Sequence, residues 1–177
     1  MNSLNTNTYQ DSQALQQQAW HLAMFSDIQL EKLKEGFNEL SLLEYDEDWR
    51  TNLVKEIGEG DIIMLYKRGE GGYVGAFKAL GWRIFYFKED REEIQLFGKD
   101  KQEVTGEAYL SDIDKYDIYD GKTDGASICA NIIVEPIAFI PEGVGNPGGI
   151  YRRTIARYDP HYAWILMEKF KQARTIK

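Results

Sequence analysis

The sequence predicts an α+β fold in which short strands form a mostly antiparallel sheet and helices pack beside it. Residues 62–66 are a continuous apolar run of strand length, and a glycine-rich reversal separates them from a second run at residues 73–79, which is the pattern of a β-hairpin. Residues 128–140 are the longest apolar segment and are rich in strand-forming residues. Apolar residues recur at helical spacing in residues 29–37 and 160–171.

The first part of the chain is predicted to contain a strand and two helices. Residues 1–18 are polar and rich in Gln and Asn, and we interpret them as a flexible N-terminal segment. Residues 20–25 read as a strand, and Ser26 and Asp27 are typical N-cap residues for the helix that follows. Residues 40–49 are acidic with scattered apolar side chains, and residues 49–57 form a second short helix before the hairpin.

The middle of the chain continues the sheet and then leaves it. In the second arm of the hairpin, Gly75 shares a face with large side chains, so another backbone or a ligand can approach there. Further strands are predicted at residues 83–87 and 94–97, with a charged connection between them. Residues 98–127 are polar, acidic and rich in turn formers, and we interpret them as an excursion within a single domain of residues 19–177.

The last part of the chain is predicted to form an edge strand and a helix. Residues 151–158 alternate in character, as in an exposed or edge strand. Asp159 is a typical N-cap, and Pro160 suits the first helical position. Helical spacing from Trp164 onward predicts that this indole packs on the sheet.

Charge is distributed unevenly along the chain. The net charge of −8 argues against a protein that coats nucleic acid with a broad positive surface. Residues 1–150 carry 27 acidic and 14 basic side chains, whereas residues 151–177 carry 2 acidic and 7 basic ones. The C-terminal segment is therefore a candidate phosphate-facing patch, and the alternative is that its cations only solvate the last helix.

No feature of the sequence indicates secretion or membrane insertion, so we expect a cytoplasmic protein. The N-terminal residues lack the basic and then apolar order of a secretory signal, and no window approaches 18 uncharged apolar residues. Cys129 is the single cysteine, which excludes an intramolecular disulfide and a zinc site built from several cysteines.

Motifs for cofactors and metals are weak. Residues 143–148 match G-x-G-x-x-G, but the segment after them reads as a strand, whereas a dinucleotide site needs a helix there, so we interpret them as a mobile loop. Residues 112–124 carry five aspartates but fail the EF-hand pattern. His21 and His161 accompany no recognisable nucleophile or metal motif. We therefore expect no catalytic residue, no cofactor and no metal.

The order of these elements resembles the EVE domain and its relatives in the PUA-like superfamily, which includes YTH and ASCH domains. The most specific piece is Gly60-Asp61 followed by the apolar strand, the turn and Gly72 to Ala76. Supporting pieces are the first strand with Trp20, residues 49–52, residues 134–137 and residues 153–155 with the closing helix. The helix before Gly60 is shorter than in typical EVE domains, and the excursion is extra.

This resemblance implies a PUA-like bent, mostly antiparallel β-barrel flanked by helices, with a cleft that accepts a flipped and often modified base. Such a cleft needs aromatic faces, groups that read the edge of the base, and a cation for phosphate. By matching position, Trp49 and Asn52 are the first candidates for stacking and edge reading. Four residues at strand ends are further ligand-binding candidates, and two arginines are phosphate-binding candidates: Trp20, Ser26, Tyr66, Trp82, Arg152 and Arg153. For each Trp, the alternative is a place in the core.

The expected function is therefore a non-enzymatic module that reads a modified base or nucleotide in nucleic acid. One alternative is a protein-interaction or assembly module, with a protein partner or a homodimer, that has no small-molecule pocket. Another is an enzyme acting on nucleotides or nucleic acid, as in some ASCH relatives.

Overall fold

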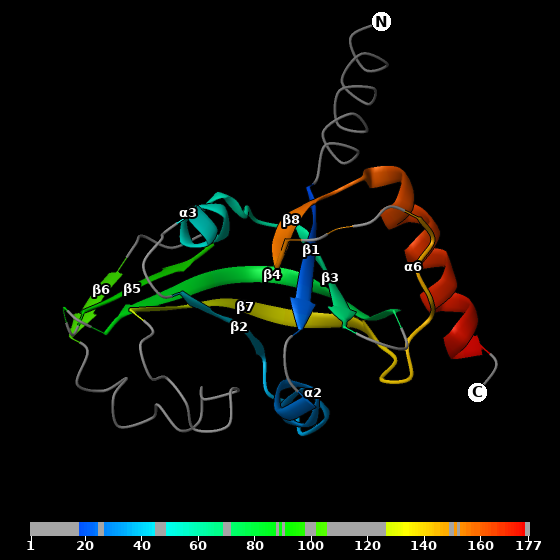
Figure 1. Cartoon of the computed structure of the whole chain (residues 1–177), viewed down its shortest axis with the longest axis horizontal. Helices are drawn as coiled ribbons and strands as arrows, with labels where there is room; N and C mark the ends of the chain where they lie inside the picture. Colours follow the sequence, from blue (N-terminus) through cyan, green and yellow to red (C-terminus); the bar gives the residue numbers. More distant parts are fainter. Residues whose placement is uncertain are drawn as a thin grey trace, which may run out of the picture.

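The computed structural model describes residues 18–24, 27–44, 49–68, 72–87, 89, 91–97, 102–105, 127–148, 151 and 153–175. In these residues, one eight-stranded sheet packs with three helices, α2 (Asp27–Lys34), α3 (Trp49–Glu56) and α6 (Pro160–Thr175) (Figure 1). The strands are β1 (Ala19–Met24), β2 (Glu39–Glu44), β3 (Ile62–Lys67), β4 (Gly72–Tyr86), β5 (Arg91–Leu96), β6 (Gln102–Thr105), β7 (Ile128–Phe139) and β8 (Ile155–Tyr158). Their order is β2-β7-β4-β3-β1-β8, with β5 paired to β4 and β6 paired to β5.

The predicted hairpin is present as the antiparallel pair of β3 and β4. β4 is longer than predicted, because it continues through residues 83–86, which we expected to start a separate strand. Gly75 lies where a β-carbon would meet the ring of Phe77 at 2.6 Å and the carbonyl oxygen of Ala138 at 3.0 Å. The small residue thus lets the backbone of β7 approach, one of the two roles predicted for it.

Most other elements agree with the sequence in type and differ at their ends, but β6 is a strand within the segment that we interpreted as a turn-rich excursion. α2 stops at Lys34, three residues earlier than predicted, and Gly36 follows with a positive φ of 94°. β2 was not predicted, because only Leu40 and Leu42 alternate with polar residues before Leu43 breaks the pattern. β8 is an edge strand, as predicted, and the cap of α6 is confirmed by a 2.8 Å hydrogen bond from the backbone N–H of His161 to Oδ1 of Asp159.

The sheet is bent but open, so the predicted closed barrel is wrong. Among the described strands, β2 pairs with β7 alone and β8 with β1 alone, and no pairing joins these two edges. α3 contacts β2, β4, β7 and β8, and its own residues Thr51 and Val54 are buried. The helix therefore fills the space across which the edges of the sheet would have to meet.

Two core clusters lie on opposite sides of the sheet. The larger cluster joins one sheet face to residues of α2 and α3, and it includes Trp20 and Trp82. In the view of Figure 1, α2 lies below the long strands and α3 lies above them. The other joins the second face of β1, β3 and β4 to α6. Ala163, Leu166 and Phe170 are the buried residues of α6, whereas Trp164 is 66% exposed. The prediction that Trp164 packs on the sheet is wrong.

Two predicted segments fall largely outside the described residues. These are residues 1–17 of the N-terminal segment and most of the excursion at residues 98–127, including its five aspartates. Of the excursion, the structure describes β6 and Ser127.

Candidate functional site

Trp49, at the start of α3, lies beside two arginine side chains. Its indole is half-buried and packs with one part against the larger core cluster. The guanidinium carbon of Arg50 lies 4.9 Å from the ring centroid, and that of Arg153 lies 5.6 Å from it. These are cation–π distances, and the two arginines are 103 positions apart in the sequence. The fold thus brings Trp49 and Arg153, both predicted site residues, together.

Asn52 lies on the same side of α3 as Trp49. The two residues are three positions apart in the helix, so their side chains are neighbours on its surface. Asn52 is exposed. We call Trp49, Arg50, Asn52 and Arg153 the Trp49 surface, and it combines an aromatic face, an amide and two guanidinium groups.

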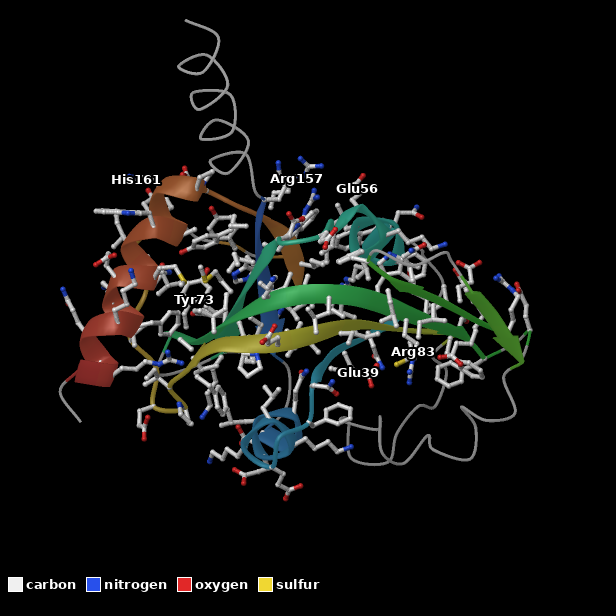
Figure 2. The ribbon with its side chains drawn as sticks, turned by 180° about the vertical axis from the view of Figure 1, so that it is seen from behind. Glu39, Glu56, Tyr73, Arg83, Arg157 and His161 are labelled. Carbon is white, nitrogen blue, oxygen red and sulfur yellow. The ribbon has the colours of Figure 1, made fainter. Side chains whose placement is uncertain are left out.

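An exposed ion pair joins α3 to β8 at this place, and hydrogen bonds to the carboxylate of Asp61 join the end of α3 to β1 and β3. Nη2 of Arg157 lies 3.4 Å from Oε2 of Glu56, and Figure 2 shows the two side chains next to each other. At the end of α3, the N–H of Gly58 donates to Oδ2 of Asp61 at 2.8 Å. The same carboxylate accepts from Nε1 of Trp20 at 3.0 Å, so α3, β1 and β3 meet at one buried acid.

Two predicted ligand residues are core residues instead. Trp20 is 0% exposed and Trp82 is 6% exposed, and both belong to the cluster under α3. A base cannot stack on either ring in this fold, so their prediction as ligand residues is wrong. Both rings are buried because α3 occupies the space over them, and the same helix keeps the two edges of the sheet apart. Ser26 and Arg152 lie outside the described residues.

Tyr66 belongs to a second aromatic group, which the sequence did not reveal. We call His21, Tyr66, Tyr73, Tyr151 and Tyr158 the His21 cluster. The ring of Tyr151 stacks on the imidazole at a centroid distance of 5.1 Å and an interplanar angle of 22°. Nδ1 of His21 and the hydroxyl of Tyr73 are 2.8 Å apart and share a hydrogen bond. Strand alternation places His21 on the opposite face from Trp20, which is the signal that could have separated them.

Three groups of the His21 cluster, His21, Tyr73 and Tyr158, have pKa values that keep them neutral at neutral pH. Burial, aided by the positive charge of Arg68, lowers the pKa of His21 from 6.5 to about 4. Burial raises the pKa of Tyr158 to about 12 and that of Tyr73 well above its usual range. The imidazole of His21 and the phenols of Tyr73 and Tyr158 are therefore neutral, which suits packing between the sheet and α6 more than acid–base chemistry.

A third polar group lies at the other end of the sheet. Nε of Arg83 is 2.9 Å from a carboxylate oxygen of Glu92 and 3.9 Å from one of Glu39, and Figure 2 shows Arg83 and Glu39 close together. Burial raises the pKa of Glu92, the charge of Arg83 opposes this shift, and the charge of Glu39 adds to it. Each carboxylate has the arginine as an ionic partner, which fits a structural role.

The glycine-rich segment at residues 143–148 is a packed loop rather than a phosphate cradle. The N–H of Val144 donates to the carbonyl oxygen of Tyr73 at 3.0 Å. Gly72, with a φ of 73°, lies so close that a β-carbon on it would meet backbone atoms of Gly145 at 3.0 Å. The next described element is the strand β8, as predicted, and not the helix that a dinucleotide site requires.

Neither a metal centre nor a membrane helix is found within the described ranges. No group of three or more His, Cys, Asp or Glu side chains there is placed to hold a metal ion. None of the helices in that part of the chain combines the length and apolar character needed to cross a bilayer.

Comparison with known proteins adds no relative to this picture. No family model, no curated protein and no solved structure matches the chain. The chain's own residues are therefore the basis for inferring a function, and predicted site residues meet at the Trp49 surface.

Proposed function

We propose that this protein is a non-enzymatic module that binds a base or nucleotide in nucleic acid, with selectivity for a modified base, at the Trp49 surface. The observation that carries the proposal is the half-buried indole of Trp49, which has the guanidinium groups of Arg50 and Arg153 at cation–π distance, with Asn52 one turn further along α3. These groups supply stacking, edge reading and phosphate binding, the three functions that recognition of an unpaired base requires.

Each residue has a distinct role in this proposal. The indole of Trp49 stacks on the base, because a large fixed aromatic face binds any base plane. The amide of Asn52 donates to and accepts from the base edge, where a modification changes the pattern of donors and acceptors. The exposed guanidinium of Arg153 moves from the ring to the phosphate, which it binds through two parallel N–H groups.

The relation to EVE and other PUA-like domains is part of the same proposal. It is supported by the strand with Trp20, the helix that starts at Trp49, and the hairpin entered through Gly60 and Asp61, which occur in the order of the resemblance. The site differs from the expected aromatic-lined cleft, because it lies on the outer side of α3 and beside β8 rather than among Trp20 and Trp82.

The test is direct binding of labelled single-stranded DNA and RNA oligonucleotides, with and without methylated bases, measured by fluorescence anisotropy. Trp49→Ala should weaken binding by roughly 5- to 150-fold, because stacking contributes about 1–3 kcal/mol per base. Trp49→Phe should recover part of the loss, since it keeps an aromatic face. Asn52→Ala should reduce the difference between methylated and unmethylated ligands.

Arg153→Ala removes the proposed phosphate contact, and Lys34→Ala is its matched control. The control removes one exposed cation from α2, which lies below the long strands in Figure 1, whereas α3 lies above them. Binding by the control should equal that of the wild type. The proposal fails if no oligonucleotide binds, or if Trp49→Ala and Asn52→Ala bind as the wild type does.

A further inference from the structure

A second half-buried aromatic ring carries a guanidinium group beside α3. Tyr86 ends β4, and like Trp49 it packs partly buried against the larger core cluster. Arg91 begins β5 and pairs with Tyr86 across the two strands, so both side chains lie on the same face of the sheet. The guanidinium carbon of Arg91 lies 4.1 Å from the centroid of the Tyr86 ring, closer than either arginine lies to Trp49. The pairing of ring and guanidinium at Trp49 is therefore repeated at Tyr86.

Lys55 of α3 connects this second ring to the Trp49 surface. Trp49, Asn52 and Lys55 follow one another at intervals of three residues, and residues three apart are neighbours on a helix surface. They form a ridge about 9 Å long, at about 1.5 Å per residue, which winds round the helix toward β4. Nζ of Lys55 donates to the hydroxyl oxygen of Tyr86 at 3.3 Å. The ridge therefore begins at one aromatic ring and ends at the other.

The two cations at Tyr86 are held in place by one acid and keep donors for a further anion. Nζ of Lys55 lies 3.0 Å from Oε2 of Glu93, and Nη1 of Arg91 bonds to the other oxygen of the same carboxylate, which is 9% exposed. An ammonium group has three N–H donors, of which Tyr86 and Glu93 engage at most two. Glu89, the other acid paired with Arg91, is 59% exposed, so a phosphate can replace it at little cost.

We propose that Tyr86 and Arg91 form a second nucleotide subsite for the strand whose base binds at Trp49, with Lys55 on a phosphate between the two rings. This inference rests on the proposed function and extends it from one nucleotide to a short single strand. The second base stacks on the ring of Tyr86, and the guanidinium of Arg91 moves from the ring to a phosphate, as proposed for Arg153 at Trp49. A single strand is required, because a base paired in a duplex offers no free face to either ring.

The experiment compares the nucleoside monophosphate of the preferred base with a tetranucleotide that contains it, each titrated into the protein by isothermal calorimetry. Tyr86→Ala should weaken binding of the tetranucleotide by roughly 5- to 150-fold and leave the monophosphate unchanged, because only the strand reaches the second ring. Tyr86→Phe keeps the ring without its hydroxyl and should retain most of the affinity for the tetranucleotide. Phe139→Ala is the matched control and should change neither affinity. It removes another ring that is partly buried against the same cluster, but Phe139 pairs with Gly75, at the other end of β4.

The ratio of the two affinities separates this inference from the proposed function. If Trp49→Ala weakens both ligands while Tyr86→Ala binds both like the wild type, the function stands and the second subsite is wrong. If Tyr86→Ala weakens both ligands by the same factor, Tyr86 only holds α3 in position and the inference is also overturned. If neither ligand binds to the wild type, both proposals fail.

Discussion

The imidazole of His21 is neutral because the fold removes it from water. It is 1% exposed, and the hydroxyl of Tyr73 and the ring of Tyr151 take the place of solvent. A histidine kept neutral by burial makes stability depend on pH, since the unfolded chain can take up a proton that the folded chain refuses.

We predict that the protein becomes less stable as the pH falls from about 6.5 to about 4. The pKa of His21 is 6.5 when unfolded and about 4 when folded, so above pH 6.5 neither state binds the proton and His21 adds no pH dependence. Between the two values only the unfolded state is protonated, and the free energy of unfolding drops by up to roughly 3 kcal/mol. Urea denaturation at pH 7.5, 5.5 and 4.5 measures this loss.

Two variants assign the pH effect to His21. His21→Phe removes the titrating group and should flatten the dependence, although it lowers stability at every pH by deleting the hydrogen bond to Tyr73. His161→Gln removes the other, exposed histidine and should keep the wild-type slope. Glu92, whose pKa is raised by burial, acts in the opposite sense, so the comparison must be between variants. An unchanged slope in His21→Phe would rule out this assignment.

Three elements meet at the carboxylate of Asp61. It accepts hydrogen bonds from the N–H of Gln18 at 3.2 Å, from Nε1 of Trp20 at 3.0 Å and from the N–H of Gly58 at 2.8 Å. Gln18 precedes β1, Gly58 follows α3, and Asp61 itself precedes β3. The position of α3, and with it the Trp49 surface, therefore depends on a buried acid.

We predict that Asp61→Ala lowers the free energy of unfolding by about 3 kcal/mol, because it leaves three buried or partly buried donors without this acceptor. Asp159→Ala is the matched control, since it deletes the exposed cap of α6 and should cost only about 1 kcal/mol. Urea denaturation measures both losses. A double-mutant cycle with Trp20→Phe should show coupling above about 0.5 kcal/mol, and additive losses would contradict a direct bond in solution.

The molecule as a whole is acidic, and its candidate ligand surface is a minor basic part of it. Arg153 and Arg157 lie close to α3, and the cations of α6 follow them in sequence. A nucleic acid that approaches this protein is repelled by most of it and attracted at that one region, so orientation as well as affinity depends on ionic strength.

We predict a modest salt dependence of oligonucleotide binding. If two or three phosphates are contacted, the slope of log K against log salt concentration should be about −1.5 to −2, from roughly −0.7 per phosphate on a single strand. Arg153→Ala should make the slope shallower by about 0.7, and Lys34→Ala should not change it. Anisotropy titrations between about 50 and about 300 mM salt measure the slope. A slope of zero would mean that a free base, and no backbone, is recognised.

Local patterns in the sequence determined most of the elements. Apolar runs and turn residues predicted the hairpin, β7 and β8, and the cap at Asp159 predicted the start of α6. They could not predict β2, in which only Leu40 and Leu42 alternate with polar residues, or which side of α6 faces the sheet. Residues 162–167 of α6 are all apolar or aromatic, so the sequence allows several sides of the helix to face the sheet. In the structure the sheet buries Leu166 instead of Trp164.

The sequence by itself determined an α+β chain with Trp49, Asn52 and Arg153 as candidate site residues, while the relation of these residues was decided by tertiary structure. Packing of α3 into the bend of the sheet buries Trp20 and Trp82, leaves the sheet open and brings Arg153 to Trp49. The physical reason is that burial and proximity depend on contacts between segments far apart in the chain. Composition and periodicity describe only the neighbourhood of each residue along the sequence.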